Sequence, residues 1–384
     1  MRAFRISVAV VLLGLVVLAG APGTLPTPAR NWSVAAIALA GVSAQEVPPN
    51  SPVKTYYIAA DEVLWNYLPH GANLSGMPIA ENEGPPRQME FRKAIYREYT
   101  DATFTELKPR PPEWEHLSIL GPLIRAEVGD TVKVVFKNNT KIPCSMHPHG
   151  LAYTKPNEGA FYADGIPNDQ KDGGRVFPGK TFTYTWTVPE RAGPAHGDAS
   201  SVLWAYHSHF VETSEMNAGL LGPIIVTAKG MSKIDGSPKD VDREFITSFA
   251  VFDEVSSPYF EANTVQTRSA TPSLTKEDPL FREPYLMMTI NGLLEGNLPM
   301  LTMKKGEHVR WYLFSNGNED DVHTPHWHGQ TVDFMHMRMD MVDLLPMSMR
   351  TVDIVPDNPG TWLFHCHVAD HLEGGMVARF TVTP

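Results

Sequence analysis

The sequence predicts an all-β fold in which two similar β-sandwich domains with Greek-key connections follow one another in tandem. Threonine alternates with aromatic or apolar residues over residues 181–188, which is the pattern of a half-buried strand. The 29 glycines and 33 prolines supply the turns that many short strands need. We place the first domain at residues 45–229, a polar linker at 230–240 and the second domain at 241–384.

The second half of the chain repeats motifs of the first half in the same order. The motif HPHG at residues 147–150 returns as HWHG at 326–329, and WAYHSH at 204–209 returns as WLFHCH at 362–367. In both halves a turn that begins with glycine leads into an apolar strand ahead of the first motif. An internal duplication of this kind indicates two copies of one structural unit.

The N-terminal segment has the features of an export signal. Arg2 and Arg5 precede an apolar run over residues 6–20, which is too short for a comfortable membrane span. A second apolar patch at 34–42 leads into small residues that are typical of a cleavage site. We expect a signal peptide over residues 1–44 and export to the periplasm or the cell exterior; an uncleaved anchor is the alternative.

Charge and cysteine content narrow the function classes. The formal net charge is −11, and no basic stripe is present to neutralise phosphates, so a nucleic-acid partner is excluded. The chain has two cysteines, Cys144 and Cys366. Because Cys366 stands among histidines and is assigned to metal, Cys144 has no disulfide partner and is expected to be a small buried side chain.

Ten of the fifteen histidines gather in four tight clusters, each with a His-x-His pair. In a strand such a pair directs both imidazoles to one face. Four pairs supply eight imidazoles, which is too many for one copper ion and suits a cluster of three. The pairs are His147 with His149, His207 with His209, His326 with His328, and His365 with His367.

The two remaining clustered histidines belong to a different kind of site. Cys366, His323 and His371 supply a thiolate and two imidazoles, and Met376 supplies a weak axial thioether. This donor set is that of a blue-copper electron-transfer centre. The histidines on either side of Cys366 point to the opposite side of the strand, so we expect a second metal centre next to the first.

The motifs HPHG, HSH, HTPHWHG and HCHVADHLEGGM resemble those of multicopper oxidases. Longer phrases such as YYIAADEVLWNY and VPDNPGTWLFHCHVADH resemble ceruloplasmin-type domains and two-domain laccases, and the similarity runs from about Tyr56 to the C-terminus. The resemblance implies two cupredoxin-like domains and four copper ions per chain: one type 1, one type 2 and two type 3. It also implies one-electron oxidation of phenols, aromatic amines or metal ions such as Fe(II) and Cu(I), coupled to the four-electron reduction of O2 to water.

The resemblance assigns each ligand. Type 1 copper falls to His323, Cys366 and His371 with Met376 axial; type 2 copper to His147 and His326; and type 3 copper to His149, His207 and His367 on one ion and His209, His328 and His365 on the other. Two-domain relatives are homotrimers in which the first domain of one chain meets the second domain of the next. We therefore expect a homotrimer with the trinuclear cluster between chains.

The first domain departs from the ligand pattern of the second. Ser208 takes the place of the cysteine, Thr213 replaces the later histidine and Leu220 falls near the axial position. A hydroxyl is not a thiolate, so we predict no type 1 copper in the first domain.

Three further residues have implied roles near copper. Asp164 matches a family carboxylate that helps to move protons to the cluster, although a turn aspartate is the alternative. Tyr153 matches a redox-active tyrosine near the type 2 copper of small laccases. We expect Asp370 to orient a ligand histidine through a hydrogen bond.

Two groups of residues bear on the electron donor. Glu319, Asp320 and Asp321 precede His323, where they either attract Fe(II) or Cu(I) or form a solvated loop. Methionines alternate over residues 335–341, where they either form a thioether patch for Cu(I) or fill the core.

Two other function classes share parts of this pattern. A copper nitrite reductase of the trimeric type needs three histidines at its catalytic copper, fewer than the eight found here. A non-enzymatic periplasmic copper-binding protein would tolerate broken ligand sets, whereas here only the type 1 set of the first domain is broken.

Overall fold

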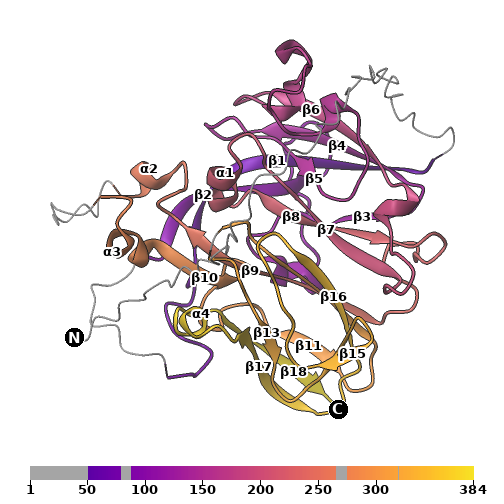
Figure 1. Cartoon of the computed structure of the whole chain (residues 1–384), viewed down its shortest axis with the longest axis vertical. Helices are drawn as coiled ribbons and strands as arrows, with labels where there is room; N and C mark the ends of the chain where they lie inside the picture. Colours follow the sequence, from indigo (N-terminus) through magenta and orange to yellow (C-terminus); the bar gives the residue numbers. More distant parts are fainter. Residues whose placement is uncertain (1–50, 79–87, 265–274, 319) are drawn as a thin grey trace, which may run out of the picture. The chain divides into compact units, whose positions relative to one another are not determined.

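The computed structural model describes residues 51–78, 88–264, 275–318 and 320–384. These residues are mainly β, and Figure 1 shows the strands of the first half in indigo to magenta and those of the second half in orange to yellow. The expected signal peptide at 1–44 lies outside the described residues. Among the residues that are described, no helix is long and apolar enough to span a bilayer.

Among the described residues, the first half of the chain forms eight strands. They are β1 (Val53–Asn66), β2 (Glu90–Tyr99), β3 (Ile124–Glu127), β4 (Thr131–Asn138), β5 (His147–Pro148), β6 (Thr181–Thr187), β7 (Ser201–His207) and β8 (Leu221–Thr227). They form two four-stranded sheets with the orders β2-β1-β4-β6 and β3-β8-β7-β5. Apolar residues from both sheets, such as Val134, Tyr184 and Ile224, meet in one buried cluster, so the two sheets form a sandwich.

The second half forms ten strands within the part of the chain that the structure describes. They are β9 (Arg243–Asp253), β10 (Leu286–Ile290), β11 (Leu301–Lys304), β12 (Val309–Ser315), β13 (Pro325–Trp327), β14 (Val332–Phe334), β15 (Met337–Met339), β16 (Met349–Ile354), β17 (Gly360–Cys366) and β18 (Val377–Thr383). The sheet orders are β10-β9-β12-β16-β14-β15 and β11-β18-β17-β13. A second buried cluster, with Trp311, Val352 and Phe364 among its members, joins these sheets.

The two halves have the same sheet topology. Replacing β1–β5 by β9–β13 and β6–β8 by β16–β18 converts the first pair of sheets into the second, apart from β14 and β15, which extend one edge. The parallel pairs also correspond: β1 with β4 matches β9 with β12, and β3 with β8 matches β11 with β18. The predicted tandem of two similar β-sandwich domains is therefore confirmed.

Helices are short and lie in the connections. The α-helices are α1 (Glu212–Ala218), α2 (Phe260–Thr264), α3 (Pro279–Arg282) and α4 (Ala369–Glu373), and the 3-10 helices are η1 (Pro112–Leu117), η2 (Lys155–Asn157), η3 (Asn168–Gln170), η4 (Asp172–Gly174), η5 (Glu190–Ala192) and η6 (Glu283–Tyr285). Two of them hold equivalent places, because α1 links β7 to β8 and α4 links β17 to β18.

Apolar and polar contacts join the two halves. A third buried cluster combines side chains of the first half, such as Leu203 and Ile225, with side chains of the second, such as Ile246. His116 in η1 also reaches β9, where its Nε2 accepts a hydrogen bond of 3.1 Å from the amide of Ile246. Burial lowers the pKa of His116 to about 4, so this histidine is neutral near pH 7 and acts as a structural hydrogen-bonding group.

Candidate metal centre

The first histidine quartet, His147, His149, His207 and His209, forms where β5 meets the end of β7. The strand register pairs His147 with His207, and the amide of His149 donates to the carbonyl of Ala205 at 2.8 Å. Because side chains alternate along a strand, each His-x-His pair presents both imidazoles on one side. Neighbouring ring centroids in this quartet lie 5.0–5.6 Å apart.

The second quartet, His326, His328, His365 and His367, repeats this construction where β13 meets β17. The register pairs His326 with His365, and the amide of His328 donates to the carbonyl of Leu363 at 3.0 Å. Neighbouring ring centroids lie 4.7–5.6 Å apart. The two quartets are thus built from equivalent strands in equivalent registers.

In each quartet two ring nitrogens face each other. The Nε2 atoms of His149 and His207 lie 3.0 Å apart, and those of His328 and His365 lie 2.9 Å apart. The Nδ1 atoms of His207 and His365 each pair with the carbonyl of the following residue, at 2.9 and 2.8 Å. With the proton on Nδ1, the lone pair of Nε2 is left for a metal ion.

The protonation of these imidazoles also suits a metal site. Burial, with a smaller contribution from neighbouring imidazoles, lowers the pKa of His207 to about 3 and those of His149 and His365 to about 4. Two unprotonated nitrogens at this separation repel each other unless a cation lies between them. The Nδ1 atom of His326 is buried with no hydrogen-bond partner among the described residues. Neutral imidazoles in this arrangement fit copper ions.

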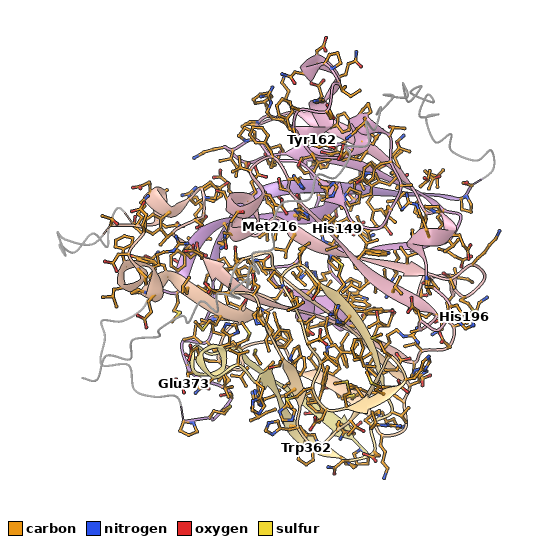
Figure 2. The ribbon with its side chains drawn as sticks, in the orientation of Figure 1. His149, Tyr162, His196, Met216, Trp362 and Glu373 are labelled. Carbon is orange, nitrogen blue, oxygen red and sulfur yellow. The ribbon has the colours of Figure 1, made fainter. Side chains whose placement is uncertain are left out.

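Two structural features require a glycine at the end of each His-x-His-Gly motif. Gly150 and Gly329 have φ values of 73° and 66°, a region that side chains rarely adopt. A Cβ atom would also lie 2.3 Å from the indole of Trp204 at Gly150 and 2.9 Å from that of Trp362 at Gly329. The close contact of glycine with tryptophan fixes the His-x-His strand against its neighbour. Figure 2 labels Trp362, the tryptophan next to Gly329, and His149 of the first quartet.

A third group brings Cys366, His323 and His371 together inside the second domain, where all three are buried. The Cys366 Sγ atom lies 3.8 Å from Nδ1 of His323 and 3.6 Å from Nδ1 of His371, and these two nitrogens are 3.0 Å apart. Met376 is fully buried; its amide donates to the carbonyl of His371 and its carbonyl accepts from the amide of Cys366. The four predicted ligands therefore belong to one compact, hydrogen-bonded unit.

The charge of Cys366 is set by its neighbours. Burial by itself raises the pKa of this thiol, but hydrogen bonds with His323 and His371 outweigh burial and bring the pKa down to about 6. The sulfur is then a thiolate at neutral pH, which is the form that binds copper.

Asp321 lies in an acidic run of the sequence, yet its carboxylate contacts a predicted copper ligand. It is buried, with Oδ1 3.0 Å from Nε2 of His323. The same carboxylate accepts hydrogen bonds from the amides of Val251 and Asn318, both at 2.9 Å. A carboxylate held in this way fixes the orientation of a ligand imidazole. Of its neighbours in the run, Asp320 is exposed and Glu319 lies outside the described residues.

The first domain keeps the backbone frame of this site but has other side chains. The main chains of Cys144 and Val176 exchange two hydrogen bonds, at 3.2 and 2.9 Å, as those of His323 and Leu344 do at 2.8 and 2.9 Å. Cys144 therefore takes the place of His323, and Ser208 takes the place of the thiolate. This explains why Cys144 is buried without a disulfide partner.

The counterpart of His371 in the first domain is Glu215. In both domains the residue before the last strand donates its amide to a carbonyl of the preceding helix: Leu220 to Glu215 at 3.2 Å, and Met376 to His371 at 2.9 Å. The expectation that Thr213 replaces the histidine is wrong, because α1 has seven residues and α4 has five, so counting along the chain goes out of step.

Asp164 is held by lysines and contacts no histidine among the described residues. A hydrogen bond from Lys171, together with the amide of Ile166 and the charge of Lys155 3.5 Å away, lowers the pKa of Asp164 to about 2. The carboxyl is therefore ionised over the whole physiological range, where it can accept a proton only transiently.

Tyr153 and Asp370 have different surroundings. The ring of Tyr153 packs edge-on against that of His147, with centroids 5.8 Å apart. Asp370 lies in the first turn of α4 and is exposed. Within the described part of the chain its carboxylate makes no hydrogen bond to a histidine, and Asp321 makes that contact instead.

The methionines over residues 335–341 are mostly on the surface. Met335 and Met337 are 72 % and 53 % exposed, and Met341 is also exposed. Met337 and Met339 belong to β15, the last strand of the six-stranded sheet, and Met339 packs against the second buried cluster. Met335, Met337 and Met341 are thus not core filler, whereas Met339 contributes to the core.

No imidazole of one quartet contacts an imidazole of the other. Every ring contact of the eight histidines, all of which are described, stays within its own quartet or reaches Tyr153. One chain therefore presents two separate groups of four imidazoles. His367 is exposed and His209 is partly exposed, so each group has an accessible edge.

Comparison with known proteins agrees with this geometry. Two family models, both described as multicopper oxidase, match residues 116–230 and 272–384. The chain is 40 % identical to Ceruloplasmin of Homo sapiens over 345 residues, which cover 86 % of the chain and 32 % of that protein. It is 39 % identical to Ferroxidase HEPHL1 of Homo sapiens over 340 residues (86 % and 29 %) and 36 % identical to Hephaestin of Mus musculus over 348 residues (88 % and 30 %). The chain spans about a third of the length of these relatives.

Solved structures show the same fold. A crystal structure of a multicopper oxidase matches with a TM-score of 0.57 at 19 % identity, covering 88 % of this chain and 92 % of that one. The Blue Copper Oxidase from Nitrosomonas europaea matches with a TM-score of 0.55 at 20 % identity, covering 86 % of each chain.

Proposed function

The chain belongs to the multicopper oxidase family, and from that premise we propose that it oxidises a reducing metal ion, Fe(II) first, one electron at a time and reduces O2 to water. The observation that carries this proposal is the pairing of a thiolate site with a histidine quartet on one strand. Cys366 ends β17, and the histidines on either side of it belong to the second quartet.

Cys366 and its neighbours supply the route between the two sites. The backbone joins Cys366 directly to His365 and His367. A hydrogen bond of 2.8 Å, from Nδ1 of His365 to the carbonyl of Cys366, adds a second connection. Copper, when bound, supplies one-electron transfer at the thiolate site and the four-electron reduction of O2 at the cluster. The chain keeps His207 and His365 neutral through burial, fixes their tautomers through main-chain carbonyls and orients His323 through Asp321.

We assign four copper ions per chain. One is held by His323, Cys366, His371 and Met376, and three by the two quartets. The geometry within each quartet supports placing His149 and His207 on one type 3 ion and His328 and His365 on the other, because these are the pairs whose Nε2 atoms face each other. The resemblance adds His367 and His209 as third ligands of these two ions and assigns His147 and His326 to the type 2 ion; Tyr153 lies beside His147.

A complete cluster needs both quartets, and we propose that they meet between chains. The quartets of one chain do not contact each other, and each has an exposed or partly exposed imidazole at its edge. A closed ring of copies, such as a trimer, would join the first quartet of every chain to the second quartet of the next. Each interface would then hold one cluster.

Fe(II) is the preferred donor for two reasons. One relative in the comparisons carries the name ferroxidase and spans most of this chain. His371 is the most exposed ligand of the thiolate site, and it lies in α4 beside two exposed carboxylates, Asp370 and Glu373. A hydrated metal cation is attracted to such a surface, whereas an uncharged phenol is not. The apolar N-terminal segment supports export from the cytoplasm.

A donor panel on copper-loaded protein tests the proposal. We expect blue protein with four copper ions per chain that consumes O2 with Fe(II), at four Fe(II) per O2. The double variant Asp370→Asn, Glu373→Gln should raise KM for Fe(II) several-fold and leave KM for a phenol unchanged. Absence of O2 uptake with Fe(II), Cu(I) and phenols alike would overturn the proposal. Two copper ions per chain together with nitrite reduction would favour the nitrite reductase class.

A further inference from the structure

The first domain has no thiolate site, yet the three segments that would form one are fastened together. These segments are the residues before β5, the residues after β7 and the helix α1. Buried polar side chains of all three segments join in one network: Ser145, Ser208 and Glu215, of which Glu215 is 2 % exposed. Buried polar groups of this kind need hydrogen-bond partners.

A continuous set of hydrogen bonds supplies those partners. The Ser208 hydroxyl donates to Oε2 of Glu215 at 2.6 Å, and the amide of Phe210 donates to the same oxygen at 3.0 Å. The hydroxyl of Ser208 in turn accepts from the amide of Ser145 at 2.9 Å. The amide of His209 donates to the hydroxyl of Ser145 at 2.9 Å. The carboxylate therefore holds the residues on both sides of His209, and Ser145 holds His209 itself.

The helix that carries Glu215 is also anchored on its other side. The Asn217 side chain accepts from the amide of Asp253 at 2.9 Å and from the side chain of Asn318 at 3.1 Å. Both partners belong to the second domain, and Asn318 is hydrogen-bonded to Asp321. Contacts with the second domain thus fix the position of α1 independently of the hydrogen bonds that Glu215 makes next to the first quartet.

We propose that Glu215 is a positioning residue for the trinuclear cluster: its carboxylate, through Ser208 and Ser145, fastens the His207–His209 segment as the ligands of the thiolate site fasten the equivalent segment of the second domain. The proposal rests on the proposed function, since it assigns those two histidines to that cluster. It explains why a carboxylate, which is costly to bury, stands where the second domain has a metal-binding histidine.

Three variants test this role. Glu215→Ala removes the acceptor of two hydrogen bonds. Glu215→Gln keeps an amide oxygen that can accept both. Thr213→Ala is the matched control, because it lies in the same helix, its side chain is exposed, and no side-chain hydrogen bond of Thr213 joins it to this network.

The first measurement is amide hydrogen exchange in the copper-free protein. In Glu215→Ala we expect exchange at the amides of His209 and Phe210 to be at least about tenfold faster, because their partners are lost or released. Glu215→Gln should restore most of the protection, and Thr213→Ala should match the unmodified protein. Equal protection in Glu215→Ala and Thr213→Ala would overturn the proposal.

The second measurement is spectroscopic and uses the copper-loaded oligomer. In Glu215→Ala we expect altered type 2 electron paramagnetic resonance and a weaker type 3 absorption band, with unchanged blue absorption from the second domain. Unaltered type 2 and type 3 signals would overturn the proposal.

If Glu215→Ala does not fold, Ser208→Ala carries the same two tests, because it removes the hydroxyl and leaves the carboxylate with Phe210. Ser208→Ala behaving as Thr213→Ala would then be the overturning result. Failure of the proposed function can be distinguished from failure of this inference, because a protein that binds copper but reduces no O2 still gives the type 2 and type 3 signals.

Discussion

The two domains solve one structural problem with different chemistry. In each, the end of a central strand, the segment before the His-x-His-Gly motif and a short helix must be held together behind a histidine quartet. The second domain uses the sulfur and nitrogen atoms of Cys366, His323 and His371, and the first uses oxygen atoms and main-chain amides around Glu215. The comparison teaches that the frame for the quartet does not require a thiolate, which under the proposed function is present to deliver electrons.

The largest effect is expected when the cysteine of the second domain is replaced by the serine that takes its place in the first domain. Cys366→Ser should abolish the blue absorption and lower O2 uptake with Fe(II) at least about a hundredfold, because a hydroxyl does not bind copper as a thiolate does. Absorption spectroscopy and oxygen electrode measurements check both. The matched control is Cys144→Ser, which should stay blue; blue colour in Cys366→Ser would break the comparison.

Complementation tests whether the quartets of different chains combine. We expect His207→Ala chains and His365→Ala chains to be inactive alone. Oligomers reassembled from an equal mixture should regain about a quarter of the activity, because random pairing joins an intact first quartet to an intact second quartet at about one interface in four. If the cluster forms within one chain, the mixture stays inactive, since every chain carries one damaged quartet.

A smaller effect is expected from the carboxylate behind His323. Asp321→Asn should weaken copper binding at the thiolate site about 10–100-fold, the usual cost of losing a partner that orients a metal ligand. Titration of the copper-free protein followed by blue absorption measures this affinity. Asp320→Asn is the control, because its side chain is exposed. Equal affinities in the two variants would show that Asp321 does not orient the ligand.

The last effect concerns stability, not copper, and arises at the contact between the domains. The pKa of His116 is about 4 in the folded protein against an ordinary value of 6.5, so the unfolded chain binds more protons between these values. His116 should therefore reduce the free energy of unfolding as the pH falls from 6.5 to 4, by up to about 3 kcal/mol. His116→Gln, in copper-free protein, should flatten that part of the pH profile in denaturant unfolding. An unchanged profile would mean that His116 is not the titrating group.

Local patterns in the sequence predict the quartets well, for a physical reason. Alternation along a strand decides which side His147 and His149 share, and the duplicated motifs reveal the pairing of His326 with the strand of Cys366. The sequence does not give the length of a short helix, so it does not show which residue of that helix faces the site. The spacing in the second domain predicts Thr213 at the position of Glu215, because the sequence does not show that α1 contains extra residues.

Burial and partners across the fold account for the other differences. Asp321 belongs to an acidic run, and the side chains of such runs are usually exposed to solvent. Its carboxylate is nevertheless buried, where it accepts a hydrogen bond from the amide of Val251 on a distant strand. A signal exists in the Asp-x-His spacing, which puts both side chains on one side of an extended segment. Asp370 is instead directly adjacent to His371 and lies in a helix, where adjacent residues point in different directions.

The side chains that differ between the two frames include Cys144, Ser208, Glu215 and Leu220, which stand where the second domain has its four predicted copper ligands. The surrounding main-chain hydrogen bonds are shared, so the first domain keeps this scaffold with a different set of side chains. A chain carrying His, Cys, His and Met at these positions would store one more electron, and its blue absorption per chain would double.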